Sequence, residues 1–299
     1  MHTASTSSSA LGGAPAGVRL PKATRVGGVQ LQVSDLARSL AYYRDVIGLR
    51  IIEVSADTAR LGAPESAESL VTLHAVPGTR PVRRRGAFGL FHFAILLPDR
   101  EALGRFVAHL VSKGVYPGMA DHRVSEAIYL SDPDGLGIEV YADRPRSTWR
   151  YTDGQLVMTT DPLDVDDLVN AATGQVWAGV PAGTTMGHVH LHVGDLDQAA
   201  AFYQRGVGFD ITVWNYPGAL FFAAGGYHHH LGTNVWAPGP GPTADQAKLL
   251  EWTTIVPSAT EAEVVARRLR DTGTPAVAAG QDWLVTDPWG TRLRISPER

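Results

Sequence analysis

The 299-residue sequence contains no cysteine. This absence excludes a disulfide framework and thiolate zinc sites, so any metal must be held by nitrogen and oxygen ligands. No stretch approaches the ~20 apolar residues that a membrane-spanning helix needs, and the first residues lack the apolar core of a signal peptide. We therefore expect a cytoplasmic protein with no membrane association.

An excess of positive charge is also lacking, because the net charge is −4 and the isoelectric point is about 6.2. Binding to nucleic acid or anionic lipid depends on a basic patch, so neither partner is expected. The hydrophobic share of 44% and the charged share of 19% are those of a globular protein with room for about two domains. Chemistry on small molecules is the function class that remains.

The chain repeats itself. GGVQLQVSDLARSLAYYRDVIGLRI (27–51) matches GHVHLHVGDLDQAAAFYQRGVGFDI (187–211) at a displacement of 160 residues. FHFAILLP (91–98) matches LEWTTIVP (250–257), and LSDPDGLGIEVY (130–141) matches VTDPWGTRLRIS (285–296), at displacements of 159 and 155. Such regular self-similarity indicates two copies of one unit.

Each copy contains two similar halves. VQLQV and VHLHV alternate apolar and polar residues, which predicts strands with one buried face. Asp35 and Asp195 then precede amphipathic stretches as helix N-caps, and Gly48 and Gly208 end them. The same order recurs from residues 91 and 250. We therefore predict an α+β fold of four βαβββ modules.

The repeats also set the expected domain boundaries. Residues 1–22, rich in Ser, Ala and Gly, are interpreted as a flexible tail. An N-terminal two-module domain is expected at 23–145, a linker or arm at 146–180, and a C-terminal two-module domain at 181–299.

Six of the 11 histidines lie in two short stretches, MGHVHLHVGDL (186–196) and GGYHHHLGTNVW (225–236). Strand alternation places His188, His190 and His192 on one face, opposite the apolar face. The same alternation, applied to the second stretch, turns His228 and His230 inward and His229 away.

The order GHVHLHVGDL, AFY, GVGF, GGYHHHLGTNVW, with DPDGLGIEVYADRP in the first copy, resembles the vicinal-oxygen-chelate superfamily. This superfamily includes glyoxalase I, fosfomycin-resistance proteins and extradiol ring-cleaving dioxygenases, and the chain is most similar to its catechol-2,3-dioxygenase-like branch. The resemblance implies that pairs of modules form two cup-shaped mixed-sheet domains whose interior holds a divalent metal.

The resemblance also implies ligand positions. His188 and His230 occupy two of them, Glu251 stands where the family commonly has histidine, and Arg294 stands where many members have glutamate. Two histidines and one carboxylate suit Fe(II), so His188, His230 and Glu251 form the predicted metal triad. Mn(II), Ni(II) and Zn(II) are alternatives, and Glu251 could instead pair with Arg294.

The first copy retains fewer ligand types. Gly28 stands at the position of His188, and only His92 and Glu139 keep residues able to bind a metal. We interpret this copy as a degenerate site with a structural role.

The predicted function is that of an extradiol dioxygenase which cleaves a catechol-like aromatic diol with O₂. Either His190 or His192 would be the acid–base group, with Tyr227 a further catalytic candidate. The predicted substrate-binding residues are Arg294, Asn234, Trp236 and His228. A glyoxalase-like lyase or isomerase and a metal-free binding protein remain alternatives, and a homodimer is left open.

Overall fold

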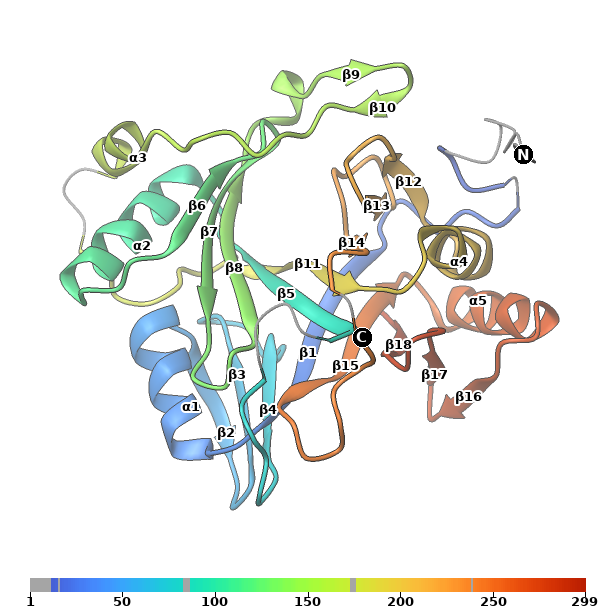
Figure 1. Ribbon diagram of the computed structural model, residues 1–299, viewed down its shortest axis with the longest axis horizontal. Coiled ribbons are helices and arrows are strands. Elements are labelled where there is room, and N and C mark those ends of the chain that lie inside the picture. Colours follow the sequence, from blue (N-terminus) through green and yellow to red (C-terminus); the bar gives the residue numbers. More distant parts are fainter. Residues whose placement is uncertain (1–11, 16, 83–86, 173–175, 238) are drawn as a thin grey trace.

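The computed structural model describes residues 12–15, 17–82, 87–172, 176–237 and 239–299, and it contains the four expected modules (Figure 1). The first consists of β1 (Arg25–Val33), α1 (Leu36–Tyr42) with a following π-helical turn, β2 (Arg50–Val54), β3 (Thr58–Gly62) and β4 (Val71–Ala75). The second consists of β5 (Gly89–Leu96), α2 (Arg100–Ser112), β6 (Gly118–Asp121), β7 (Ser125–Ser131) and β8 (Gly137–Asp143).

The third and fourth modules follow a connecting segment. The third has β11 (Thr185–His192), α4 (Leu196–Ala199) with a π-helical turn, β12 (Asp210–Val213), β13 (Ala219–Ala223) and β14 (Leu231–Asn234). The fourth has β15 (Lys248–Val256), α5 (Ala259–Asp271), β16 (Ala276–Ala279), β17 (Asp282–Thr286) and β18 (Arg292–Pro297). The α+β prediction is confirmed.

The predicted helix boundaries have a clear local cause. The Asp35 and Asp195 carboxylates accept hydrogen bonds from the third backbone N–H that follows each of them, at 2.9 and 2.7 Å, which satisfies donors that the helix leaves unpaired. Gly48 and Gly208 end the two segments with φ of 89° and 107°. Only glycine adopts this conformation without steric cost.

The modules do not pair in chain order. The first and fourth form one eight-stranded sheet, the outer sheet, in the order β16-β17-β18-β15-β1-β4-β3-β2. The second and third form the other, the inner sheet, in the order β12-β13-β14-β11-β5-β8-β7-β6. The expected N-terminal and C-terminal two-module domains therefore do not correspond to the two sheets.

The reason is that the paired edges lie far apart in the chain, and the local pattern of each first strand does not specify which edge it meets. In the structure β1 runs antiparallel to β15, and β5 runs antiparallel to β11. The apolar faces of these strands, with the helices, contribute to one continuous core that includes Leu31, Val189 and Trp252.

The segments expected to be irregular are partly ordered. Within the predicted tail, Leu20 is buried and its N–H donates to the Gly208 carbonyl at 2.8 Å, whereas residues 1–11 and 16 lie outside the described residues. The linker contains a 3₁₀ turn, the hairpin of β9 (Tyr151–Thr152) and β10 (Gln155–Leu156), and α3 (Val165–Ala171). No helix that the structure describes is long and apolar enough to cross a membrane.

Candidate metal centre

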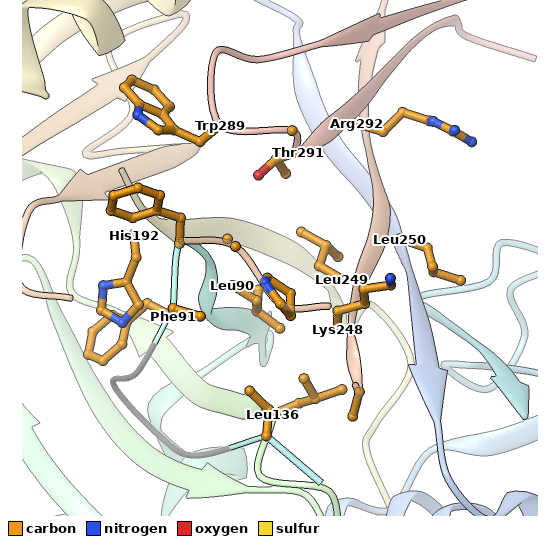
Figure 2. A pocket seen from close by; sticks show the side chains of 18 of the residues that line it. Leu90, Phe91, Leu136, His192, Lys248, Leu249, Leu250, Trp289, Thr291 and Arg292 are labelled. Atoms are coloured by element: carbon orange, nitrogen blue, oxygen red, sulfur yellow. The ribbon is translucent and has the colours of Figure 1, made fainter. Parts of the chain in front are cut away.

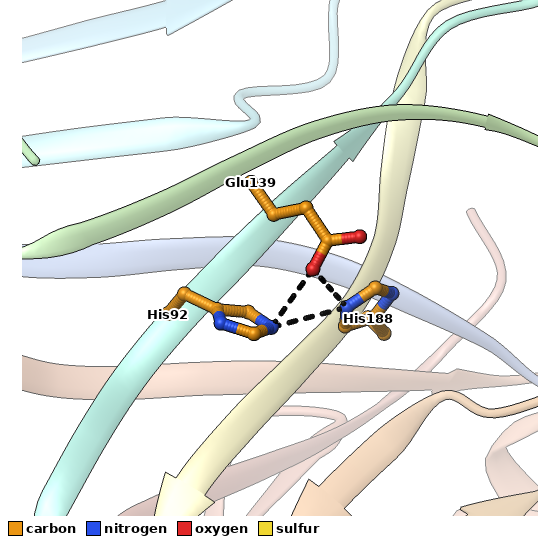
Figure 3. A group of neighbouring side chains, drawn as sticks. All are labelled: His92, Glu139 and His188. Carbon is orange, nitrogen blue, oxygen red and sulfur yellow. Dashed lines mark hydrogen bonds and ion pairs between the residues drawn. The ribbon is translucent and has the colours of Figure 1, made fainter. Parts of the chain in front are cut away.

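Three buried side chains converge in the middle of the inner sheet: His92 from β5, Glu139 from β8 and His188 from β11 (Figure 3). Glu139 Oε2 lies 3.0 Å from His92 Nε2 and 3.2 Å from His188 Nε2, and the two nitrogens are 3.3 Å apart. We call these residues the His–His–Glu group. They are the one set among the described residues whose donor atoms meet at metal-binding distances.

The register of the three strands explains the convergence. Ala94 on β5 is the cross-strand partner of both Glu139 and His188, so all three side chains point to the same face of the sheet. His92 lies two residues earlier and therefore shares that face. Because the Ala94 side chain is small, it leaves space into which the longer side chains on either side extend.

Burial sets the charge of this group. It lowers the pKa of both imidazoles, although the neighbouring carboxylate opposes the shift. Burial alone would raise the pKa of Glu139, but the contacts with His188 and His92 hold it well below the usual range. Two neutral imidazoles beside one ionised carboxylate carry a net charge of about −1.

These residues fit a divalent cation. The donor set of two imidazole nitrogens and one carboxylate oxygen is the facial arrangement typical of non-haem Fe(II) sites. The converging Nε2 and Oε2 atoms are lone-pair donors, and the group contains no Lys or Arg to balance Glu139. The Nδ1 atom of His188 is buried and has no hydrogen-bond partner within the described part of the chain.

The expected triad is not brought together. Glu251 lies on β15 in the outer sheet, where it accepts hydrogen bonds from Arg294 at 2.5 and 3.2 Å and from Gln30 at 2.9 Å. Of the three predicted ligands, only His188 belongs to the His–His–Glu group. The alternative in which Glu251 pairs with Arg294 is the arrangement found.

The predicted orientations within HHH (228–230) also differ from the structure. Strand β14 begins at Leu231, so strict alternation does not extend to these residues. The ring of His229, expected to point away, lies 4.1 Å from that of His188, centroid to centroid. His230 instead accepts a hydrogen bond from the Ala224 N–H at Nδ1, and burial lowers its pKa to about 3.

A hydrogen-bonded chain fixes the tautomer of His229. His228 Nε2 lies 2.9 Å from the Asp143 carboxylate, and His228 Nδ1 lies 2.7 Å from His229 Nδ1. A hydrogen bond donated by His228 Nε2 to the carboxylate corresponds to the tautomer of His228 with its single proton on Nε2, in which Nδ1 accepts from His229. The Nε2 atom of His229 is then left with a lone pair, and burial holds the pKa of His229 well below its ordinary value.

Tyr129 and His122 form a second polar pair beside Glu139. Tyr129 is the cross-strand partner of Glu139, its hydroxyl lies 2.5 Å from His122 Nε2, and His122 Nδ1 lies 2.5 Å from the Thr159 carbonyl. A carbonyl can only accept, so His122 Nδ1 donates to it and Nε2 accepts from the tyrosine. Burial raises the pKa of Tyr129 well above 10, which keeps it a neutral phenol.

The other predicted residues lie around the group without forming it. His190 is the cross-strand partner of His92, and its Nε2 has no partner among the described residues. Asn234 accepts from the Trp236 N–H at 3.1 Å and lies 2.6 Å from His192 Nδ1. Tyr227 bonds the hydroxyl of Tyr141 and the carboxylate of Asp143, at 2.7 and 3.2 Å.

Sequence reasoning did not single out His122, Tyr129 and His229, which the structure places around the His–His–Glu group, and it assigned His92 and Glu139 to a degenerate copy. One signal was present in the sequence. His92 and Glu139 keep ligand types in the second module, as His188 does in the third. These three residues form one set as soon as the second and third modules share a sheet.

The comparisons with known proteins agree with this architecture. The family model of the Glyoxalase/Bleomycin resistance protein/Dioxygenase superfamily matches residues 25–140 and 185–295. The chain belongs to this superfamily. Within it, the chain is 44% identical over 271 residues to Catechol-2,3-dioxygenase of Bacillus subtilis (strain 168), a match that covers 89% of this chain and 94% of that protein.

Two further matches are more distant. Biphenyl-2,3-diol 1,2-dioxygenase 3 of Rhodococcus globerulus is 27% identical over 155 residues, which is 50% of this chain and 81% of that protein. The structure of glyoxalase I from Zea mays superimposes with a TM-score of 0.53 at 18% identity, covering 91% of this chain and 92% of that one. This likeness confirms the fold.

Proposed function

We propose that the protein is a metal-dependent extradiol dioxygenase that opens the ring of a catechol-like aromatic diol with O₂. The observation that supports this proposal most directly is the buried His–His–Glu group, in which two neutral imidazoles and one carboxylate converge without a cationic side chain. The 44% identity to a protein named Catechol-2,3-dioxygenase supports the same reaction class.

In this proposal His92, His188 and Glu139 hold Fe(II). When bound by such a donor set, the ion supplies redox chemistry and open coordination positions for the diol and O₂. Mn(II) fits the same ligand types.

Residues beside the group provide proton transfer. His229 presents a lone pair on Nε2, and its Nδ1 is held through His228 to Asp143, whose side chain is 29% exposed. We assign to His229 the acceptance of a phenolic proton from the substrate, in place of the predicted His190 or His192. Tyr129, kept neutral by burial and donating its proton to His122, orients a substrate hydroxyl by accepting a hydrogen bond from it.

Aromatic side chains give the site its substrate class. Phe91, Phe221 and Trp236 surround the ring of His190 with centroid separations of 5.2, 5.6 and 5.6 Å. Flat rings of this kind pack favourably against an aromatic substrate. We therefore assign Trp236 to substrate binding, as the sequence predicts.

The test is metal analysis and O₂ uptake of anaerobically purified protein reconstituted with Fe(II), with His188→Ala beside His230→Ala. Both substitutions remove a buried histidine, but only His188 belongs to the His–His–Glu group. We expect one iron per chain and catechol-dependent O₂ uptake in the wild type and in His230→Ala, with both lost in His188→Ala. Iron retained by His188→Ala would contradict the ligand assignment, and bound metal without O₂ uptake would favour an isomerase.

A further inference from the structure

A cavity of about 450 Å³ lies where the first residues of β5 and β15 meet the hairpin that leads into β18, and its wall includes Phe91, the chain neighbour of His92 (Figure 2). We call it the side pocket. Its volume lies within the ~300–1,000 Å³ typical of small-molecule sites. Leu90, Leu249 and Trp289 contribute apolar surface to its wall.

Phe91 contacts both the side pocket and a residue of the His–His–Glu group. Phe91 lines the pocket, is half-buried, and places its ring 4.9 Å from that of His92. The same ring lies 5.2 Å from His190 and 4.9 Å from His192, which also lines the pocket. A rotation of Phe91 would therefore join the pocket to the space beside the ligands.

Two other approaches to the group are filled by packed side chains. The linker residues Trp149 and Leu156 are buried in a cluster with Phe221 and Tyr227, across the face that carries the histidines. A smaller cavity beside His230 is separated from His188 by the buried Tyr141, whose hydroxyl bonds Tyr227. The half-buried Phe91 is the least enclosed of these barriers.

The side pocket is positively charged. Lys248 and Arg292 line it, on the side opposite Phe91 and His192 (Figure 2), and none of its lining residues is Asp or Glu. The Lys248 ammonium donates to the Thr243 carbonyl at 3.3 Å, and neither Lys248 nor Arg292 forms an ion pair with a described carboxylate. Two unneutralised cations in a chain of net charge −4 make this pocket attractive to anions.

We propose that the side pocket admits the substrate and receives a negatively charged substituent on it, so that the preferred substrates are catechols bearing a carboxylate. The diol would face Phe91 and the His–His–Glu group, and the carboxylate would face Lys248 and Arg292. The inference rests on the proposed dioxygenase function, because that function makes the substrate a catechol whose diol faces the His–His–Glu group. The preference of the pocket for a charged ligand can be measured separately.

The test compares Lys248→Gln/Arg292→Gln with the wild type and with Lys113→Gln/Arg267→Gln. The control removes one lysine and one arginine from exposed positions on helical segments away from the pocket. Values of kcat/KM are measured for 3,4-dihydroxyphenylacetate and for neutral 4-methylcatechol. Binding of 4-hydroxyphenylacetate, which lacks the second hydroxyl, and of neutral 4-methylphenol is measured by calorimetry on metal-free protein.

We expect kcat/KM for the anionic catechol to fall about tenfold in the pocket variant and to stay unchanged in the control, with little change for 4-methylcatechol. Raising the salt concentration should lower kcat/KM for the anionic catechol more than for 4-methylcatechol, because salt screens its attraction to the two cations. Equal kcat/KM for both catechols in all three proteins would overturn the inference while leaving the dioxygenase assignment intact.

If neither catechol is cleaved, the proposed function fails and the binding measurement still decides the inference. Weaker binding of 4-hydroxyphenylacetate in the pocket variant alone would support an aromatic carboxylate site. Binding that is absent, or unaffected by both double substitutions, would overturn it.

Discussion

The inner and outer sheets are built from equivalent modules, yet they differ in whether a cationic side chain balances the charge of a buried carboxylate. In the inner sheet Glu139 lies between two neutral imidazoles, and no cationic side chain balances it. In the outer sheet the buried Glu251 is paired with Arg294, which also bonds Asp282 at 2.9 Å. A buried charge is costly without a counter-charge, and this difference supports the proposed cation in the inner sheet while giving none a place in the outer sheet.

The residues at equivalent positions of the two sheets explain why only one sheet has a group of metal-binding side chains. Glu251 and Arg294 of the outer sheet stand where the inner sheet has His92 and Glu139, and Gly28 stands where it has His188. A Cβ atom at Gly28 would lie 2.2 Å from the Ser69 carbonyl. The backbone of the outer sheet therefore leaves no room for a ligand at this position unless it shifts.

The strongest test of this comparison exchanges one carboxylate in each sheet for its amide. Glu139→Gln removes the only charge of the His–His–Glu group, whereas Glu251→Gln alters a site already neutralised by Arg294. Since changes to outer-shell partners of a metal already cost about 10–100-fold in affinity, we expect iron affinity to fall by more than about 100-fold in Glu139→Gln. Iron titration followed by absorbance or competition with a chelator measures it.

The Glu251→Gln protein is the matched control and should keep wild-type iron affinity. An equal loss of iron in both variants would show that the two sheets do not differ as described, because it would make Glu251 a ligand or a close support of one.

A second test concerns the cross-strand partners of Glu139 in the inner sheet and Arg294 in the outer sheet. Tyr129 pairs across the sheet with Glu139, and the equivalent partner of Arg294 is Leu284. We expect Tyr129→Phe to keep its iron and lower kcat by roughly 10–100-fold, because proton transfer and hydrogen bonding to the reacting group contribute on this scale. Steady-state O₂ uptake with a catechol measures kcat, and Leu284→Met serves as the control.

Unchanged kcat in Tyr129→Phe would remove the tyrosine from the reaction and leave its bond to His122 a structural one. Loss of iron in this variant would instead mean that the phenol positions Glu139.

Much of this comparison could be predicted from sequence, for identifiable reasons. The four modules, the N-caps at Asp35 and Asp195 and the inward face of His188 follow from local alternation and helix signals. The sequence does not predict which modules share a sheet, because pairing between β1 and β15 joins residues 216 to 230 positions apart, and nothing in either strand specifies that edge. The wrong pairing then selected Glu251 in place of His92 and Glu139.

The error at His230 had a different physical origin. Alternation was extended through residues that form the turn before β14, where no sheet hydrogen bonding enforces it. His229 faces His188 because of this local irregularity, which no strand periodicity can predict.

A third prediction uses a feature that both halves of the chain share. Tyr43 bonds Asp132 at 3.2 Å, and the equivalent Tyr203 bonds Asp287 at 2.8 Å, so each links two consecutive modules. Burial raises the pKa of Asp132 to about 6, although backbone N–H donors oppose the shift. The folded protein thus binds a proton that the unfolded chain releases near pH 4.

The sign of the pH dependence follows. A carboxyl whose pKa is raised on folding adds stability below the unfolded pKa, and this stability is lost as pH rises through about 6. Since one pKa unit corresponds to about 1.4 kcal/mol, the loss is up to about 3 kcal/mol. Urea unfolding at each pH measures this dependence. Between pH 4 and 6.5 the free energy of unfolding should fall less steeply with rising pH in Asp132→Asn than in the wild type, because the substituted amide does not titrate.

Asp287→Asn is the matched variant in the other half of the chain. Burial also raises the pKa of the Asp287 carboxyl, so this substitution should change the pH dependence of stability in the same direction. An unaltered pH profile in Asp132→Asn would mean that this carboxyl stays ionised and paired in the folded protein near pH 5.

The smallest expected effect comes from breaking the ion pair that distinguishes the outer sheet. Arg294→Ala leaves Glu251 and Asp282 without their shared cation, and we expect a loss of about 2 kcal/mol in the free energy of unfolding, because Arg294 is 25% exposed and water can partly replace it. Arg294→Lys should recover part of the loss, and iron content should not change in either protein. Iron bound by the outer sheet of Arg294→Ala, detected as a second equivalent per chain, would show that the guanidinium excludes a cation there, whereas loss of the first equivalent would contradict the independence of the two sheets.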